Sequence, residues 1–336
     1  MGWEPVSGQI LAGDIGGTNA RLALFDAAGT TPAVTEVYPS AEHDGLGEIV
    51  EAFLRAHPAE PLAASFGIAG PVRGGRTTGT NLAWDVDAAE LQTRLRIERL
   101  ELLNDLEANA WGLEALDADD LMPLHDSDPE PGGTVALISA GTGLGEAFLT
   151  YGPSGPAVQA SEGGHVDFAP RSDLEAELRD WLAGSGEEHV SYERVCSGMG
   201  MVNIYAFLRE RAGAPEPAWL RSAEPGDEAA AISRAGLERS DALADEALDL
   251  MVSIYGAQAG NLALTVLATG GVYLGGGIAP RIADRLREGG FLRSFRAKGR
   301  MGELIERIPV HIVLNDRAAL LGAARHATTL VGGAGR

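Results

Sequence analysis

Cysteine and lysine are almost absent from this chain of 336 residues, in which each occurs once, as Cys196 and Lys298. A single cysteine excludes an intrachain disulfide and any zinc or iron–sulfur site built on several thiolates. A single lysine, outside any glycine-rich motif, excludes a GxxxxGK P-loop, a strand lysine of the protein-kinase type and a Schiff-base lysine at a motif. Any phosphate chemistry must therefore use glycine N–H groups, Asp, Thr, Asn and Arg.

Basic residues are also scarce: the chain has 26 Lys and Arg but 48 Asp and Glu, which gives a formal net charge of -22. Nucleic acid is not an expected partner, since binding it requires clustered Lys and Arg that displace counterions. A nucleoside triphosphate is an anion too, but salt screens distant charges beyond about 8 Å. Local N–H donors and a bound Mg²⁺ therefore decide whether it binds.

No basic residue precedes Arg21 and no long apolar run begins the chain, so we expect no signal peptide. The single cysteine favours a reducing, cytoplasmic location. The range 250–280 lacks charged residues and is long enough to span a bilayer. Gly256, Gln258 and Gly260 interrupt it, however, so the pattern predicts a buried helix followed by a buried strand, and no membrane association is expected.

The stretch Leu11–Phe25, LAGDIGGTNARLALF, predicts two strands joined by a glycine bend. Gly16 and Gly17 are expected to adopt the positive φ of a tight bend, and without a Cβ they let phosphate approach the backbone N–H groups. Thr18 and Asn19 add side-chain donors, and Asp14 can hold a hydrated Mg²⁺ against phosphate. The alternative is a simple glycine turn; this combination favours phosphate binding.

A second strand–glycine–strand pattern follows, with AGTGLG at Ala140–Gly145 between the apolar ranges 135–138 and 147–149. It lacks an acid equivalent to Asp14, so a metal is expected on the first hairpin only. The length predicts two domains, and two related hairpins suggest a nucleotide clamped between lobes built on similar plans.

Asn104 and Asp105 follow a predicted strand at Leu100–Leu103, at the strand end where α/β proteins bind ligands. Phosphoryl transfer to an alcohol needs a carboxylate that orients the hydroxyl and accepts its proton, and an aspartate of ordinary pKa, about 3.9, is ionised at neutral pH. The alternative role is capping of the following helix.

Glu162 and His165 lie on a glycine loop, EGGH, and suit the hydroxyls of a polar ligand. Zinc is a rival, but His189 and Cys196 form no recognisable ligand spacing. Glu193 by itself is typical of a solvated helix residue. The triplet Gly275–Gly277 after an apolar strand would suit an adenine ring against bare backbone or, equally, a tight turn, and Arg21 is either a phosphate ligand or an outward strand residue.

In this order the chain carries GDIGGTNARLALFD, GIAGPV, NLAW, ND, GTGLG, EGGHVDFAP, ERVCSG, AGNLAL, LGGGIAP and LLGAARH. Together these motifs closely resemble the bacterial glucokinases, the zinc-free ATP-dependent group of the hexokinase and actin-like superfamily, from about Leu11 to His326. Leu106 and Met199 depart from residues common in that family, and a change in packing near the sugar is the expected consequence. The cysteine-rich zinc motif of the related ROK family is missing.

The resemblance implies an α/β, two-lobe actin-like ATPase (ribonuclease H-like) fold with a ligand cleft between the lobes. A small domain of residues 1–108 and 317–336 and a large domain of residues 109–316 would close over glucose and Mg-ATP. It further implies a cytoplasmic homodimer that makes glucose 6-phosphate, the first step of glycolysis, without zinc. Asp105 would be the catalytic base, and Asn104, Glu162, His165 and Glu193 would bind the sugar.

For ATP, the expected residues are those of the three glycine segments: Gly13, Asp14, Ile15, Gly16, Gly17, Thr18, Asn19, Gly141, Thr142, Gly143, Gly275, Gly276 and Gly277. Asp14 is also the expected Mg²⁺ residue, acting through water. Two alternatives stay open at this point. One is a kinase for another hexose or an amino sugar, and the other is an actin-like nucleotide-binding regulator without sugar chemistry.

Overall fold

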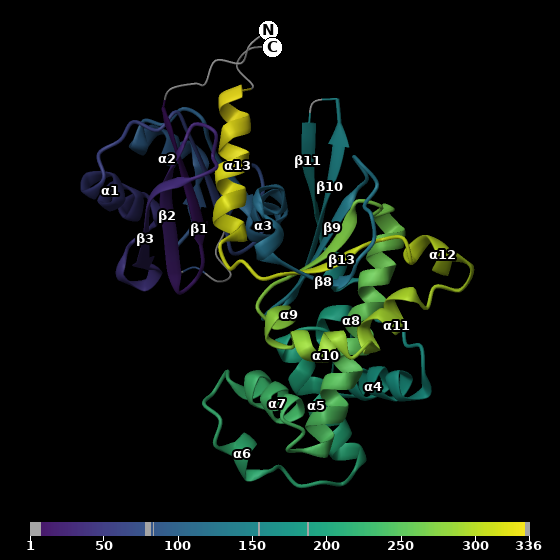
Figure 1. Cartoon of the computed structure of the whole chain (residues 1–336). Helices are drawn as coiled ribbons and strands as arrows, with labels where there is room; N and C mark the ends of the chain where they lie inside the picture. Colours follow the sequence, from purple (N-terminus) through teal and green to yellow (C-terminus); the bar gives the residue numbers. More distant parts are fainter. Residues whose placement is uncertain (1–7, 78–81, 83, 154, 187, 333–336) are drawn as a thin grey trace. The chain divides into compact units, whose positions relative to one another are not determined.

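The computed structural model describes residues 8–77, 82, 84–153, 155–186 and 188–332. By its internal contacts the chain forms two compact units (Figure 1). The first contains residues 1–120, 158–160 and 315–336, and the second contains residues 121–157 and 161–314. Two residues of the NLAW motif, Asn81 and Ala83, lie outside the described residues.

In its described part, the first unit holds a five-stranded sheet with the order β3-β2-β1-β4-β7. Strands β1 and β2 are antiparallel, whereas β1, β4 and β7 run parallel. The elements of this unit are β1 (Gln9–Ile15), β2 (Asn19–Asp26), β3 (Pro32–Pro39), η1 (Ser40–Glu42), α1 (Leu46–Ala56), β4 (Ala63–Ile68), β5 (Arg76–Thr77), β6 (Val86–Asp87), α2 (Ala88–Leu95), β7 (Leu100–Asn104), α3 (Asp105–Gly112), η2 (Leu113–Ala115), η3 (Ala118–Asp120) and α13 (Ala318–Gly332).

The second unit repeats this plan, since its sheet has the order β11-β10-β9-β12-β13-β8 with β9 and β10 antiparallel and β9, β12 and β13 parallel. Its elements are β8 (Leu121–His125), β9 (Val135–Ala140), β10 (Leu144–Gly152), β11 (Gly155–Ser161, except residues 158–160, which are counted with the first unit), η4 (Gly163–His165), α4 (Asp173–Gly184), η5 (Tyr192–Arg194), α5 (Gly198–Arg211), α6 (Ala218–Arg221), α7 (Glu228–Leu237), α8 (Ala242–Val266), β12 (Gly271–Gly275), α9 (Ile278–Arg281), α10 (Ala283–Arg287), α11 (Gly290–Arg296), η6 (Gly299–Met301), α12 (Gly302–Ile305) and β13 (Val310–Val313).

Helix α13 returns from the end of the chain to cover the first sheet, against β1 and β4, and to pack on α3 (Figure 1). Glycine makes the close approach of the two helices possible. A Cβ on Gly322 would lie 1.7 Å from the carbonyl oxygen of Ala108, and one on Gly112 would lie 2.1 Å from that of Ala318. The C-terminal helix therefore supports the helix that begins at Asp105.

The second part of helix α8, from residue 250, begins the uncharged range 250–280, and the helix is buried on most sides within the core of the second unit. Gly256 and Gly260 lie against α11, since a Cβ there would come within 2.1 Å of the Phe291 carbonyl oxygen and 2.5 Å of the Phe295 carbonyl oxygen. The predicted buried helix and following strand are confirmed. Among the described helices, none combines the length and the apolar character that crossing a membrane requires.

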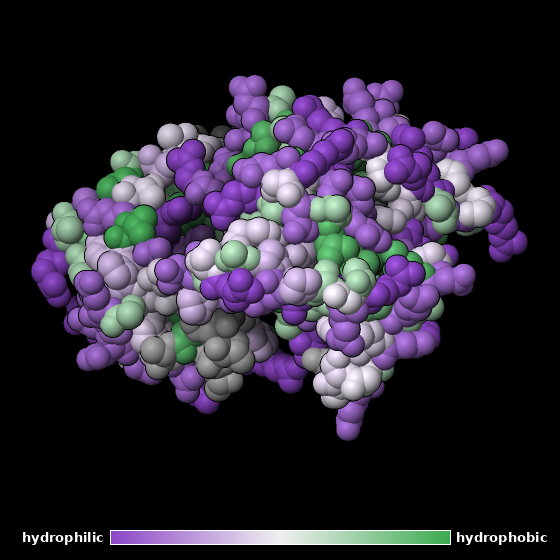
Figure 2. Space-filling view, turned by 90° about the horizontal axis from the view of Figure 1, so that it is seen from below, coloured by the Kyte–Doolittle hydropathy of each residue, from purple (hydrophilic) through white to green (hydrophobic). Residues whose placement is uncertain are grey.

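Figure 2 shows one face of the molecule, on which hydrophilic residues predominate and hydrophobic residues form small separate groups. Large exposed hydrophobic residues of the described part are distributed over different elements, such as Val37 on β3, Val166 after η4 and Leu267 after α8. Single exposed residues of this kind are normal on protein surfaces and need no ligand to explain them.

Candidate active site

The first predicted phosphate turn links β1 to β2, as expected. The N–H of Gly16 donates to the Asn19 carbonyl at 2.9 Å, and the Ser40 hydroxyl donates to the Gly16 carbonyl at 2.8 Å. Neither Gly16 nor Gly17 has a positive φ, so that part of the prediction is wrong. The bend closes without left-handed φ at either glycine.

The residues just before the turn serve packing. A Cβ on Gly13 would lie 2.6 Å from the Phe66 ring, and the side chain of Ile15 is fully buried, so the side-chain positions of both face the core. Gly17, Thr18 and Asn19 are exposed at the bend. The exposed part of the motif is therefore the part able to reach a ligand.

Asp14 lies opposite Arg21 in the β1–β2 register. Burial raises the pKa of the Asp14 carboxyl, the positive charge of Arg21 lowers it, and the negative charge of Asp316 raises it again. Arg21 in turn pairs with Asp316 at 3.4 Å. Arg21, whose role the sequence left open, is thus a charge neighbour of Asp14 within a cluster in which carboxylates outnumber it.

Asn104 ends β7 and caps α3, and its two side-chain groups are both engaged. Its Oδ1 accepts from the N–H of Leu106 at 2.7 Å, and its Nδ2 donates to the Gly70 carbonyl at 3.0 Å. The Glu107 carboxylate returns to the Asn104 N–H at 2.8 Å and completes a capping box. Asn104 is therefore the residue that caps the helix. Because Asp105 is not the cap, helix capping does not explain why an aspartate stands at this position.

The Asp105 carboxyl accepts from the N–H of Leu106 at 3.0 Å. Burial raises its pKa to about 6; the backbone hydrogen bond opposes this shift, and the charge of Asp14 adds to it. The expectation of an untuned aspartate is wrong, because the sequence does not show how far β7 and α3 remove this carboxyl from water. At neutral pH it remains mostly ionised and is a stronger base than an exposed aspartate.

The second predicted turn, Gly141–Gly143, links β9 to β10 and is confirmed as a hairpin. The N–H of Gly141 donates to the Gly143 carbonyl at 2.9 Å, and Gly198, at the start of α5, donates its N–H to the Gly141 carbonyl at 2.8 Å. A Cβ on Gly143 would lie 2.4 Å from Oε2 of Glu193. This turn therefore lies directly against one of the residues expected to bind sugar.

Glu162, His165 and Glu193 come together within the second unit. His165 Nε2 lies 3.9 Å from Glu162 Oε2, and its Nδ1 lies 3.9 Å from Glu193 Oε1. The Glu193 side chain is 20% exposed, whereas those of Glu162 and His165 are 81% and 57% exposed. Glu193 had looked like a solvated helix residue; its long-range contacts with His165 and β10 correct that interpretation.

The Gly275–Gly277 segment leads from β12 into α9, and Pro280 lies in the first turn of that helix. Gly276 has φ of +79°, and a Cβ there would lie 2.3 Å from the Ala140 carbonyl oxygen. Around Gly277 a Cβ would meet nothing within 4 Å. The first part of the triplet is a tight turn against β9, and its last glycine faces open space.

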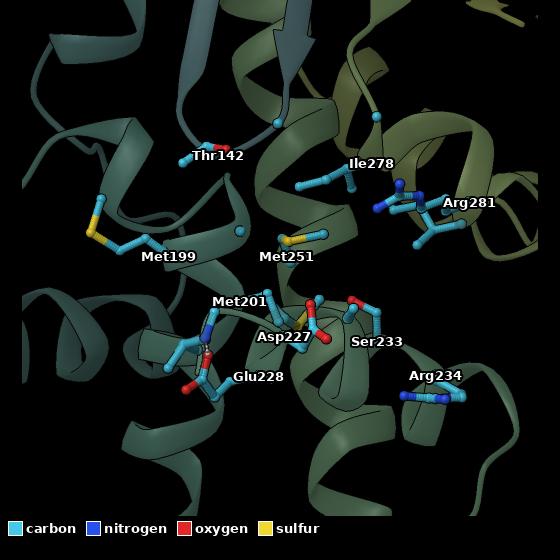
Figure 3. A pocket seen from close by; sticks show the side chains of 18 of the residues that line it. Thr142, Met199, Met201, Asp227, Glu228, Ser233, Arg234, Met251, Ile278 and Arg281 are labelled. Carbon is cyan, nitrogen blue, oxygen red and sulfur yellow. Dashed lines mark hydrogen bonds between the residues drawn. The ribbon is translucent and has the colours of Figure 1, made fainter. Parts of the chain in front are cut away.

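That space is a cavity of about 1060 Å³ in the second unit (Figure 3). Its wall includes Gly141, Thr142 and Gly277 from the predicted nucleotide segments. In Figure 3, Thr142 and Ile278 lie on one side of it and Asp227 and Ser233 on the other. Two expected ATP segments, distant in the sequence, thus share one cavity large enough for a nucleoside.

Helix α7 supplies a further part of the wall, beside residues of α5, α8 and α9, and sequence patterns alone did not identify it. Ala231, Ile232 and Ala235 are buried, and the opposite side of α7 contributes Ser233 and Arg234 to the cavity. Alanine-rich and charged composition hid this role. Met199 also lines the cavity and accepts a contact from Arg194, which directly follows Glu193, so its departure from the family pattern affects this wall.

Among the residues that the structure describes, no three His, Cys, Asp or Glu side chains are grouped as metal ligands. A single half-buried carboxylate with other acids nearby is present at Asp14. Such an arrangement fits a magnesium ion that keeps most of its waters and takes further oxygen ligands from phosphate.

Two sheets of matching strand order, each with a glycine turn between antiparallel strands, define a two-lobe ATPase of the actin-like fold. The carboxylate at the end of β7 and the acid–imidazole group on η4 and η5 are those expected of a member that acts on a sugar. The chain belongs to the glucokinase family, whose model, named Glucokinase, matches residues 11–330.

Individual relatives of the chain support the same family membership. The glucokinase of Nostoc punctiforme is 43% identical, with 96% of this chain and 99% of that protein covered. The crystal structure of a glucokinase from an Antarctic psychrotroph is 33% identical with a TM-score of 0.86, over 96% of this chain and 99% of that one. A ROK family glucokinase from Streptomyces griseus, solved in complex with glucose and AMPPNP, shares the fold at 22% identity with a TM-score of 0.64, over 96% of this chain and all of that one (100%).

Proposed function

We propose that this chain phosphorylates glucose with ATP, the activity for which its family is named, and that Asp105 is the general base. Family membership across residues 11–330 supports the reaction. The observation that supports Asp105 is its raised pKa at the end of β7. The resemblance that the sequence motifs carry assigns the same role to this residue.

In this mechanism the 6-hydroxyl of glucose attacks the γ-phosphorus of ATP. The oxygen–phosphorus bond to glucose forms as the bond to the ADP oxygen breaks, and the hydroxyl proton passes to a carboxylate oxygen of Asp105. A general base of this kind contributes about 10²- to 10⁴-fold to the rate. The products are glucose 6-phosphate and ADP.

The sugar is held by Asn104, Glu162, His165 and Glu193 in this proposal. Carboxylate oxygens accept from sugar hydroxyls, while the imidazole N–H and the amide donate to them. The proximity of His165 to both glutamates supports a shared ligand, because each hydroxyl can then be bound by two groups. Such contacts select for a polyol, and kinetic comparison of hexoses determines which epimer is preferred.

For ATP, the proposal assigns the phosphates to the bends at Gly16–Asn19 and Gly141–Gly143, and the nucleoside to the cavity beside Gly277. Support comes from the cavity, which includes Thr142 and Gly277 in its wall. Asp14 would hold Mg²⁺ through water, and the ion would neutralise charge on the phosphates. No zinc is part of this proposal.

We also propose the division into a small domain, residues 1–108 with 317–336, and a large domain, residues 109–316, acting as a cytoplasmic homodimer. The net charge of -22 supports a protein that binds neither nucleic acid nor anionic membrane surfaces. A lone, buried cysteine, Cys196, supports a reducing compartment.

The deciding experiment is a coupled assay of ADP release with a panel of hexoses, amino sugars and nucleoside triphosphates. We expect the highest kcat/KM with glucose and ATP. A larger kcat/KM with mannose or an amino sugar would identify that sugar, in place of glucose, as the preferred substrate. Absence of any sugar-dependent ADP release would instead favour the nucleotide-binding regulator.

A further inference from the structure

Glu146 is a buried acid without a basic partner. It lies on β10 with 2% of its surface exposed, and none of the ion pairs of the described residues includes it. Its Oε1 accepts a hydrogen bond from Nε2 of Gln258, on α8, at 2.8 Å. Removing a carboxyl from water without a charge partner is costly, so its retention there calls for a physical explanation.

The second carboxyl oxygen of Glu146 faces the turn that carries the sugar residues. A Cβ built on Gly163 would lie 1.9 Å from Glu146 Oε2, and one on Gly164 would lie 1.9 Å from the Leu144 carbonyl oxygen. Both glycines of the EGGH segment thus lie directly on β10. The position of the turn, and with it the direction of Glu162 and His165, depends on what β10 presents at these two points.

The same acid is connected to the segment that carries Glu193. Gln258 Oε1 accepts from Asn261 Nδ2 at 3.1 Å, and Asn261 Nδ2 also donates to the Tyr192 hydroxyl at 3.0 Å. Tyr192 begins η5 and directly precedes Glu193. A buried polar chain therefore runs beneath both sugar-binding segments, from Glu146 through α8 to Tyr192.

The only lysine of the sequence closes this chain at its far end. Lys298 Nζ donates to Asn261 Oδ1 at 2.5 Å and to the Ala257 carbonyl at 2.8 Å. Burial, followed by the charge of Arg171, lowers the pKa of this ammonium to about 8. The lysine fixes the Asn261 amide so that its Nδ2 is directed to Gln258 and Tyr192.

Burial raises the pKa of Glu146 to about 7, against the lowering by the Gln258 hydrogen bond. The titratable groups that this carboxyl influences, the Cys196 thiol and the Tyr255 hydroxyl, also have pKa values raised by burial and are neutral. Below pH 7 the side chain is therefore mostly a neutral acid, which glutamine matches in both shape and charge.

Resting on the proposed function, we propose that Glu146 is a positioning residue for the sugar: by contacting Gly163 and binding Gln258, it sets the place of Glu162, His165 and Glu193. It does not contact the reacting atoms, so its removal should weaken glucose binding and leave the chemical step nearly unchanged.

The test compares Glu146→Ala, Glu146→Gln and Leu178→Ala at pH 6.5. Leu178, fully buried on α4 in the same unit, controls for loss of stability alone. We measure KM for glucose, KM for ATP, kcat, the midpoint of thermal unfolding, and glucose binding without nucleotide by calorimetry.

Glu146→Ala should raise the KM and Kd for glucose about tenfold, with kcat and the KM for ATP within about threefold of the wild type. Glu146→Gln should restore the glucose KM to within about threefold, and Leu178→Ala should lower only the unfolding midpoint. A wild-type glucose KM in Glu146→Ala, or equal increases for glucose and ATP, would overturn the inference. A wild-type enzyme without glucose turnover would overturn the proposed function instead.

Discussion

The backbone N–H of Leu144 donates to Oε2 of Glu193 at 2.9 Å. Leu144 is the first residue of β10 after the Gly141–Gly143 turn, so one strand start connects the proposed phosphate turn to the proposed sugar residue. A Cβ on Gly143 would lie within 2.4 Å of the same oxygen. The proposed nucleotide and sugar residues of the second unit are therefore in direct contact.

Gly143→Ala should displace the Glu193 carboxylate and break its bond to Leu144. We expect a rise in the glucose KM of about tenfold, equivalent to about 1.4 kcal/mol of lost binding. Gly141→Ala is the matched control in the same turn, because a Cβ there meets nothing within 4 Å and the φ of Gly141 is not positive. Similar glucose KM values for the two variants would contradict the contact.

Asp105→Asn should lower kcat by about 10²- to 10⁴-fold, since the amide cannot accept the hydroxyl proton. Asparagine keeps an oxygen that accepts from Leu106, so the Kd for glucose, measured by calorimetry, should change by less than about threefold. Asp119→Asn, an exposed aspartate in the same unit, provides the control for a lost charge. Turnover near that of the wild type would remove Asp105 from the role of base.

The same substitution should stabilise the nucleotide-free protein at pH 7. The folded-state pKa of Asp105, about 6, lies above the unfolded value near 3.9, so folding favours the protonated acid. The stability linked to this group is complete below pH 3.9 and is lost as the pH rises through 6. Asp105→Asn should recover about 3 kcal/mol at pH 7 and nothing at pH 3.5, as measured by urea unfolding.

Asp14→Asn should weaken the use of magnesium. A half-buried carboxylate whose charge Arg21 only partly compensates favours a nearby cation, and the amide removes that attraction. We expect the Mg²⁺ concentration for half-maximal rate to rise at least about tenfold. Asp316→Asn removes an exposed charge of the same cluster and should change it by less than about threefold. Unaltered Mg²⁺ dependence in Asp14→Asn would contradict the assignment.

Arg285→Ala should destabilise the second unit. This arginine is 3% exposed and connects α10 to Asp245 and Asp249 on α8 and to the Gly236 carbonyl on α7. Its removal leaves the buried Gly236 carbonyl oxygen unpaired and takes the cation away from two carboxylates that are partly or largely exposed, at a cost of about 1 to 3 kcal/mol. Arg287→Ala, exposed on the same helix, should cost less than about 0.5 kcal/mol. Equal unfolding midpoints for the two variants would contradict the role of Arg285.

Local patterns in the sequence carried much of the fold. Both hairpins, the strand ending at Asn104, the long buried helix and the strand before Gly275 all follow from apolar spacing and turn residues within short windows. The glycine bends and Asp105 could be identified as candidate site residues from the sequence as well. Each is recognised by its residue type and by its position at the end of a predicted strand, and both are visible within a few residues of the chain. The missing P-loop lysine excluded an entire class of nucleotide sites.

Features that arise from contacts between segments far apart in the sequence could not be predicted from local patterns. Glu193 is recognisable as a candidate site residue only in the folded chain, where η5 lies beside β10 and His165. Helix α7 is recognisable as part of a cavity wall only because its polar side faces that cavity. The pKa of Asp105 and that of Glu146 are raised by burial, which is a property of the packed chain. Sequence by itself determined which groups are available and where strands turn; tertiary structure decided which of them are removed from water and which contact one another.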